Sequence, residues 1–313
     1  MQRGGARPPA TIEFATDCSP LPMSPTFRRG TLSELECPAY SYLYCNFVVD
    51  DDFTIRECLS LDDFQKCVDL ERRVWKNEDI DVMPVRLYQI SKACNAPTLG
   101  AFTSSGLLVA FGHTTIALRE GRPAYHSHML AVEAGLRDQN LGYKIKLAQR
   151  QHALRAGIDL IFWTFDPLIS RNAHFNINKL GVVLRRYERN YYGQGVSTGF
   201  DLDIPTDRVI AEWWVASDRV KSVLAGHYPK PDKVTAEIEI PDDINSIRAH
   251  STREHLEWRM RVREQFETQI AGGAVAAGFL RDPESRTSRY LLRSAADPVL
   301  ASPAGAFPSD LST

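Results

Sequence analysis

The spacing of apolar residues changes its period several times along the chain, and each change predicts a strand or a helix. A period of two is typical of strands, and a period near 3.6 is typical of helices. Phe64, Val68, Leu70 and Val74 show the second pattern, and Asp62 can cap their helix. The predicted order is strand, helix, helix, three strands, helix, strand, helix and strand, over residues 53–58, 62–75, 84–93, 98–102, 107–116, 125–132, 142–156, 160–165, 172–180 and 182–191.

This mixed order implies an α/β (α+β) fold with a central, mixed and mostly antiparallel sheet flanked by helices. Alternation returns at residues 237–240, a polar helix is predicted at 252–270, and a hairpin surrounds 282–284. Gly and Pro interrupt residues 1–50, while Ala, Pro and Ser dominate residues 294–313, so we expect both to be disordered. Residues 40–49 are more apolar and could instead add a strand to the sheet. The expected division is an extension at 1–50, a main domain at 51–200, a C-terminal accessory region at 201–293 and a tail at 294–313.

Charge and composition exclude several classes of protein. The net charge is −2, and no basic cluster of the kind that binds nucleic acid is present. No apolar run approaches the roughly 18 residues that span a bilayer, and Arg3 and Arg7 precede no apolar signal segment. The six cysteines form no CxxC pair and have no His at ligand spacing, so neither a metal site nor a disulfide framework is expected. We therefore expect a cytoplasmic protein with reduced thiols and no membrane contact.

The most informative segment, residues 126–144, is a predicted strand followed by a short polar turn and a long helix. The first N–H groups of such a helix lack helical partners and lie at the positive end of its dipole, where a pyrophosphate fits. Gly142 permits close backbone approach, and Arg137 adds charge. The segment lacks the glycines of a Rossmann fingerprint and the Gly-Lys-(Ser/Thr) of a P-loop. Taken alone, it is more often an ordinary strand, turn and helix.

Arg137-x-x-Asn140-x-Gly142 resembles the (Gln/Arg)-x-x-Gly-x-(Gly/Ala) loop with which GNAT N-acetyltransferases bind the pyrophosphate of acyl-CoA. Residues 172–182, which end in Lys-Leu-Gly-Val, resemble the second cofactor motif of this family. Six consecutive elements in the family's order make the resemblance more specific than the loop alone. It covers residues 53–200 and implies a GNAT fold.

Two departures from the family pattern affect the expected chemistry. Asn140 replaces the first glycine, although Asn tolerates left-handed backbone angles better than most residues. Ile177 and Asn178 lie where the family often has a Tyr that protonates the departing thiolate, so the general acid is not identified. The chain also resembles a group of predicted acetyltransferases with a long C-terminal extension, through the segments at residues 130–133, 164–167 and 211–214.

The resemblance implies transfer of an acetyl or longer acyl group from acyl-CoA to an amine, by direct attack in a ternary complex and without a metal. The acceptor is expected to be a small-molecule or protein amine. One alternative is a non-catalytic module that binds acyl-CoA as a sensor, and another is a regulatory protein that has lost the cofactor. Residues 252–270 could be a solvated face, a cover over the acceptor or a homodimer contact. The implied cofactor-binding residues are Leu130, Val132, Arg137, Asp138, Gln139, Asn140, Leu141, Gly142, Tyr143 and Asn172.

His126 and His128 are the first candidates for the catalytic base. They are two residues apart on a predicted strand, so they share a face. The pattern His-x-His-x-Leu-x-Val is similar to a strand of arylalkylamine N-acetyltransferases whose histidine pair is thought to relay the substrate proton. The competing interpretation is a pair of structural or surface histidines. Glu133 is the second candidate base, and Asp166 either binds a cationic substrate or forms an Asp-Pro turn.

Aromatic residues offer two interpretations. Trp75, Trp163 and Phe165 could line an acceptor pocket, but aromatics at alternate strand positions more often belong to the core. Trp213 and Trp214 are adjacent, so they cannot both point to one face of a strand. We expect one of them to cover the edge of a groove.

Overall fold

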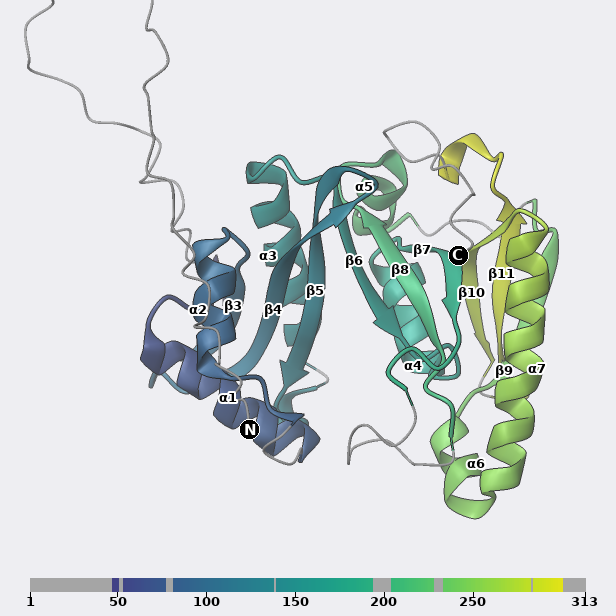
Figure 1. The fold of residues 1–313 in the computed structure, drawn as a ribbon, viewed down its shortest axis with the longest axis horizontal. Coiled ribbons are helices and arrows are strands. Elements are labelled where there is room, and N and C mark those ends of the chain that lie inside the picture. Colours follow the sequence, from purple (N-terminus) through teal and green to yellow (C-terminus); the bar gives the residue numbers. More distant parts are fainter. Residues whose placement is uncertain are drawn as a thin grey trace, which may run out of the picture. The chain divides into compact units, whose positions relative to one another are not determined.

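One mixed sheet runs through the part of the chain that the computed structural model describes, residues 47–50, 53–76, 81–137, 139–193, 204–227, 233–282 and 284–300 (Figure 1). Its eleven strands lie in the order β1-β2-β3-β4-β5-β6-β8-β7-β10-β11-β9. Within these residues, β5 and β6 form the parallel pair and the other neighbours are antiparallel. The predicted α/β class with a mostly antiparallel sheet is confirmed. The strands are Phe47–Asp50 (β1), Phe53–Glu57 (β2), Thr98–Thr103 (β3), Leu108–Arg119 (β4), Arg122–Val132 (β5), Leu160–Phe165 (β6), Val183–Glu188 (β7), Arg208–Trp214 (β8), Ala236–Pro241 (β9), Ala274–Asp282 (β10) and Thr287–Ser294 (β11).

The cap of the first helix lies two residues before the predicted one. Ser60 accepts a hydrogen bond from the N–H of Asp63 at 3.0 Å, and the Asp63 carboxylate accepts one from the N–H of Ser60 at 3.4 Å. This capping box satisfies two free N–H groups at once, so the prediction of Asp62 as the cap is wrong. The helices are Leu61–Trp75 (α1), Val85–Ala93 (α2), Leu141–Arg155 (α3), Ser170–Ala173 (α4), Asp218–Leu224 (α5), Ile244–His250 (α6) and Thr252–Ala271 (α7), with short helical turns at Ala134–Leu136 (η3), His174–Lys179 (η4) and Pro298–Leu300 (η5).

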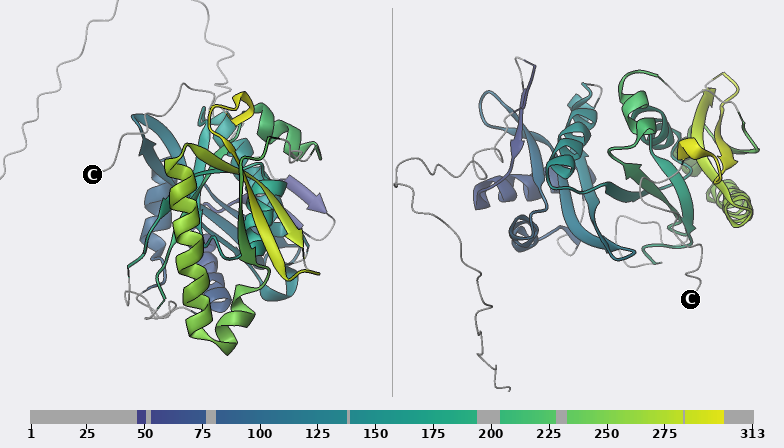
Figure 2. Two further views of the ribbon diagram at one scale, coloured as in Figure 1. Left: turned by 90° about the vertical axis from the view of Figure 1, so that its right-hand side faces the viewer. Right: turned by 90° about the horizontal axis from the view of Figure 1, so that it is seen from above.

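Helices cover both faces of the first strands (Figure 2). Phe64 of α1 and Tyr88 of α2 pack with Phe111 of β4 on one face. On the opposite face, Leu141 and Ile145 of α3 pack among apolar side chains of β2, β3 and β4. Because both faces are covered, α3 is held directly behind the strands that lead to the site described below.

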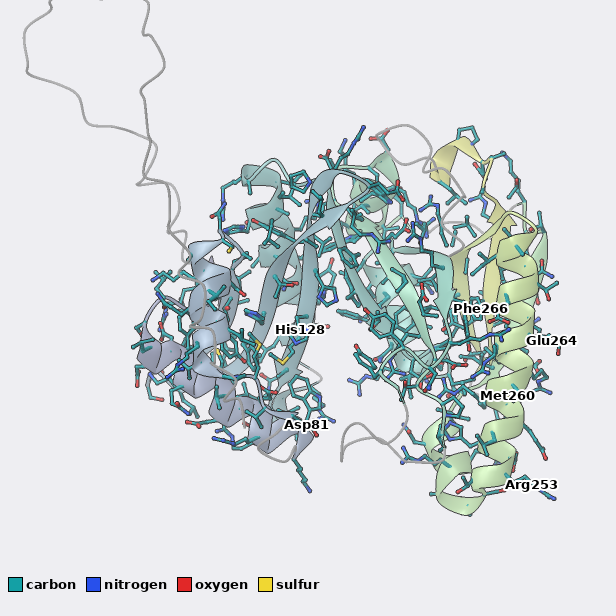
Figure 3. The ribbon with its side chains drawn as sticks, viewed as in Figure 1. Asp81, His128, Arg253, Met260, Glu264 and Phe266 are labelled. Carbon is teal, nitrogen blue, oxygen red and sulfur yellow. The ribbon has the colours of Figure 1, made fainter. Side chains whose placement is uncertain are left out.

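The long polar helix α7 has one packed side. Phe266 stacks on Tyr187 of β7 with ring centroids 5.5 Å apart and meets Tyr290 of β11 edge-on at 5.0 Å. Figure 3 shows Phe266 directed toward the strands, whereas Met260 and Glu264 point away from them. The helix therefore contributes to the core through one stripe of its surface.

The sheet does not end where the sequence predicted a division at residue 200. Strand β8 lies between β6 and β7, and β10 joins β7 through the pair Ala276 and Leu184. Residues 44–313 form one compact unit. Residues 47–50 form β1 although they fall in the predicted extension, and residues 1–46 and 301–313 lie outside the described residues. The accessory region thus shares the sheet, and its separate role stays a prediction.

The expectation that Trp213 or Trp214 would cover a groove edge is wrong. Trp213 is 0% exposed and Trp214 is 8% exposed, although their side chains point to opposite faces of β8. Both are buried because this part of the sheet is covered on both sides.

Replacing Gly112 by Ala is expected to lower the free energy of unfolding by about 1–3 kcal/mol through overpacking. A Cβ at this position of β4 would lie 2.7 Å from Cγ2 of Ile145 and 3.1 Å from Nε2 of Gln149, both on α3. Urea unfolding followed by circular dichroism measures the change. Gly135→Ala is the control, since a Cβ there meets nothing within 4 Å. Equal stability of the two variants would contradict the close approach of α3 to β4.

Candidate functional site

Strands β5 and β6 separate soon after they meet. Their parallel pairing consists of Tyr125 with Ile161 and His126 with Phe162, and beyond these pairs the strands diverge (Figure 1). A β-bulge accompanies the divergence. On β4, His113 pairs with Met129 and the next residue pairs with Ser127, so His128 is the extra residue. A bulge bends its strand and increases its twist, which here turns β5 away from β6.

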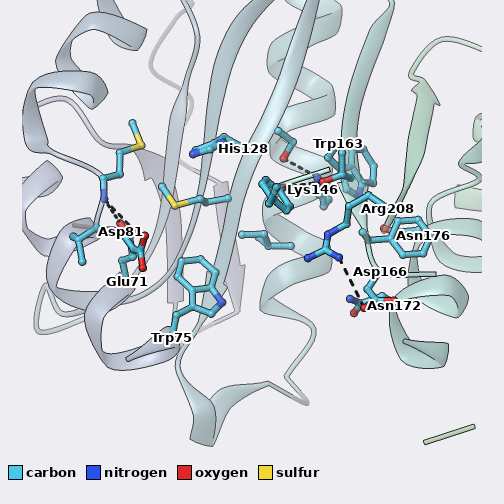
Figure 4. Close-up of a pocket in the computed structure, with 18 of the residues that line it drawn as sticks. Glu71, Trp75, Asp81, His128, Lys146, Trp163, Asp166, Asn172, Asn176 and Arg208 are labelled. Carbon is cyan, nitrogen blue, oxygen red and sulfur yellow. Dashed lines mark hydrogen bonds and ion pairs between the residues drawn. The ribbon is translucent and has the colours of Figure 1, made fainter. Parts of the chain in front are cut away.

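A cavity of about 740 Å³ occupies this region, and we call it the β5–β6 cavity (Figure 4). One wall comes from α1, α2 and the segment between them, and the other from β6, α4 and η4. Strand β5 and Lys146 of α3 supply further lining. The lining residues are Glu71, Trp75, Asp81, Val82, Met83, Pro84, Leu87, Ser127, His128, Met129, Leu130, Lys146, Trp163, Thr164, Phe165, Asp166, Asn172, Phe175, Asn176, Tyr192 and Arg208.

The start of α3 lies beside the end of β5. Asn140 has φ 57° and no side-chain cap bond, so the left-handed conformation expected at this position is present. A Cβ at Gly142 would lie 3.6 Å from Leu130 and Val132 of β5, an ordinary contact distance. Leu130 lines the cavity, so the helix start adjoins its edge without forming part of the lining.

Other members of the predicted pyrophosphate loop fall into two groups. Arg137 and Gln139 are exposed, and Asp138 lies outside the described residues. Leu141 is 0% exposed and belongs to the core, so only its backbone could face a ligand. The Tyr143 side chain is half-buried against the main core. The loop can therefore offer backbone N–H groups and the Arg137 cation, but little side-chain contact from the helix itself.

The structure brings the two candidate histidines together and adds a third. The ring centroids of His126 and His128 are 5.7 Å apart, and His113 of β4 lies 6.2 Å from His128. His128 lines the cavity, whereas His126 packs against Phe162 at 5.0 Å. Burial lowers the pKa of His126 to about 4, with further lowering from nearby cations, and loss of solvent also lowers the pKa of His128. Both shifts favour the neutral ring, which is the form that can accept a proton.

The acidic candidates have partners outside the cavity. Glu133 forms an ion pair with Arg73 at 3.2 Å and is not among the lining residues. Asp166 lines the cavity, but its two oxygens accept hydrogen bonds from Arg259 of α7 at 2.8 and 2.7 Å. It also accepts a bond from the N–H of Leu168 at 2.9 Å, as an Asp-Pro turn would.

The three aromatic candidates line the cavity, and two of them also belong to the hydrophobic core. Trp163 and Phe165 are 7% and 6% exposed and belong to the main core, yet both border the cavity. Trp75 is 40% exposed at the opposite wall. Asn172 also lines the cavity.

The sequence analysis did not identify five ionisable lining residues, Glu71, Asp81, Lys146, Tyr192 and Arg208, and two of them are buried on helices. Glu71 of α1 is 2% exposed, accepts bonds from the Met83 N–H at 3.3 Å, and has its pKa raised by burial. Lys146 of α3 is also 2% exposed. Each lies on the apolar side of its helix, as Glu71 follows Phe64 and Val68 at helical spacing. A charged residue on an apolar helix face is the signal that identifies both.

Within the described residues, no helix is long and apolar enough to cross a membrane. The same residues contain no group of three or more His, Cys, Asp or Glu side chains placed to hold a metal ion. Cys58 and Cys67, which are free thiols, are buried beside each other with their Sγ atoms 3.9 Å apart.

Comparison with proteins of known structure finds acetyltransferases. The chain is similar to an acetyltransferase of the GNAT family from Streptococcus pneumoniae, with 16% identity, 51% of this chain and 98% of that chain covered, and a TM-score of 0.42. It is also similar to the ribosomal-protein-S18-alanine N-acetyltransferase from Escherichia coli, with 16% identity, 52% and 94% covered, and a TM-score of 0.41. No family model matches the chain, and no curated protein does.

Proposed function

We propose that this protein is an N-acyltransferase that moves an acetyl or other acyl group from acyl-CoA to an amine. The observation that carries the proposal is the separation of β5 and β6 around a cavity, with an uncapped helix start beside the end of β5. A long, thin thiol cofactor with a diphosphate needs a slot between backbones and a positive helix end at its mouth. The resemblance of residues 137–142 to the GNAT loop supports the same assignment.

The donor would lie with its diphosphate on the backbone N–H groups of residues 139–143, beside the Arg137 cation. Its pantetheine arm would enter between β5 and β6. The edge of β5 after His126 has no ladder partner on β6 among the described residues, so backbone groups near Leu130 and Val132 are open to hydrogen bonding. The same N–H groups would stabilise the tetrahedral oxyanion. Asn172 lines the cavity across from them and could bind the arm.

The acceptor amine must lose a proton before it attacks, because a free alkyl ammonium has a pKa near 10. We assign this step to the neutral pair His128 and His126, since His128 lines the cavity and His126 lies next to it. Direct attack fits the lining, which includes no cysteine. The Tyr192 hydroxyl, 2.9 Å from Oγ1 of Thr164, is a lining group that could return a proton to the departing thiolate.

The wall formed by α1 and the following segment favours a cationic acceptor. Glu71 and Asp81 both line it, and Trp75 supplies an aromatic face nearby (Figure 4). A carboxylate and an aromatic ring both attract an ammonium group. The acceptor would therefore be a small-molecule or protein amine that approaches along this wall.

Two measurements test the proposal. CoA at 100 times its dissociation constant should stabilise the protein by about 2.7 kcal/mol in thermal unfolding. Mass spectrometry should then detect an acylated amine when purified protein is incubated with acetyl-CoA and a broad amine panel. Absence of CoA binding would refute the donor site. Binding without turnover across the panel would favour the sensor alternative, which lacks only the chemical step.

A further inference from the structure

Lys146 is a buried cation-forming group that the proposed reaction does not use. Its side chain extends from α3 to the β5–β6 cavity and is 2% exposed at residue level. Nζ donates a hydrogen bond to Oγ of Ser127 at 2.8 Å and lies 3.5 Å from the ring centroid of Trp163 (Figure 4). Among the residues that the structure describes, no carboxylate lies within ion-pair distance of this nitrogen.

A chain of hydrogen bonds fixes the orientation of Lys146. The Ser127 hydroxyl donates to Oε1 of Gln149 at 3.2 Å, and Nε2 of Gln149 donates to Oγ1 of Thr114 at 3.0 Å. Because Ser127 has used its only proton, it can only accept from Lys146. An ammonium has three donors, so Ser127 satisfies one of them and leaves others for a ligand in the cavity.

The surroundings of Lys146 favour an anion. Burial without a counter-ion penalises the ammonium and lowers its pKa well below the usual value. His126, the titratable residue of β5 whose pKa Lys146 helps to lower, supplies no negative charge. A carboxylate beside Nζ would restore the charged form and receive strong, charge-assisted hydrogen bonds. A purely apolar ligand would instead leave the remaining N–H groups of Lys146 without partners in a site that excludes water.

We propose that Lys146, held by Ser127 and by the ring of Trp163, forms a carboxylate subsite at the floor of the β5–β6 cavity. This inference rests on the proposed acyl transfer, because it assigns the carboxylate to one of that reaction's two substrates. The carboxylate belongs either to the acyl group of the donor, as in a dicarboxylic acyl-CoA, or to an amino-acid-like acceptor. The cavity is then polarised, with Glu71 and Asp81 on the wall that attracts an ammonium and Lys146 at the end that binds the anion.

Two matched pairs of ligands distinguish the sources. For the donor, the dissociation constants of succinyl-CoA and butyryl-CoA are compared by calorimetry, since both acyl chains have four carbons and one lacks the carboxylate. For the acceptor, the dissociation constants of 4-aminobutyrate and butylamine are measured on the free protein and again on the CoA-saturated protein. One of the carboxylates should bind roughly tenfold or more tightly than the partner that lacks the carboxylate. Plain CoA is titrated in parallel and reports on the proposed function separately.

Lys146→Met and Lys146→Gln should each abolish this preference while the affinity for plain CoA stays unchanged. Met fills the buried space, and Gln keeps a donor for Ser127, so the two variants place different demands on folding. Lys221→Met is the control, because this lysine is exposed on α5, away from the cavity. The subsite is refuted if native protein prefers neither carboxylate over the partner that lacks it. It is equally refuted if the preference persists in a folded Lys146 variant.

Discussion

Gly142→Glu is expected to weaken CoA binding at least 100-fold without unfolding the protein. A Cβ at this position meets Leu130 and Val132 at 3.6 Å, so added side-chain atoms near the backbone cause no severe clash. A carboxylate in the first turn of α3 is also favourable for the free helix. The loss comes from repulsion, since two like charges about 5 Å apart near a protein surface cost about 3 kcal/mol.

Two further substitutions isolate the charge. Gly142→Gln has the same size as Gly142→Glu without the negative charge, and Gly142→Ala adds only the methyl group that the structure accommodates. We expect both to retain most of the CoA affinity measured by calorimetry. If Gly142→Glu bound CoA as tightly as Gly142→Gln, the diphosphate would lie elsewhere and the assignment of residues 139–143 would be wrong.

The double variant His126→Ala with His128→Ala is expected to lower kcat/KM at pH 7 by roughly 100-fold or more, the typical contribution of a general base. In native protein, burial lowers the pKa of both His126 and His128 below the usual 6.5, so the activity should decline as pH falls below that value. Without the pair, the reaction depends on amine that has already lost its proton. The rate should then climb about tenfold per pH unit toward the amine pKa near 10.

A pH–rate profile of kcat/KM measures both effects in one experiment. His250→Ala is the control, because this exposed histidine of α6 does not line the cavity. The single variants show which ring takes the proton, and we expect His128→Ala to have the larger effect because His128 borders the cavity directly. An unchanged profile in the double variant would make Glu133 the preferred base, despite its ion pair with Arg73.

Elements with a clear period were predictable from the sequence. Strand β6 has the bounds that alternation predicts, and the hairpin of β10 and β11 surrounds the predicted turn at 282–284. The order of the strands in the sheet was not predictable from the sequence, because β8 lies between β6 and β7 through pairings that no local pattern specifies. The predicted domain boundary at residue 200 followed a change in composition. Composition does not determine where the sheet ends, because the sheet depends on long-range hydrogen bonds.

The candidate site was predictable in part. The sequence indicated the strand with His126 and His128 and the uncapped start of α3, since both depend on local order. It did not indicate the bulge at His128, because a bulge is a relation between two strands. Glu71 and Lys146 had a visible signal, an ionisable residue at an apolar helical position, which helix prediction treats as an interruption.

The ties between α7 and the sheet affect how the chain can be shortened. Arg259 binds both oxygens of Asp166 at the end of β6, and Arg263 binds both oxygens of the buried Asp207 just before β8. Removing α7 would take from two carboxylates the arginines that bind both of their oxygens, and one of these carboxylates lies at the cavity wall. Helix α7 therefore acts as a brace for one wall of the β5–β6 cavity, and a shortened chain has to keep it.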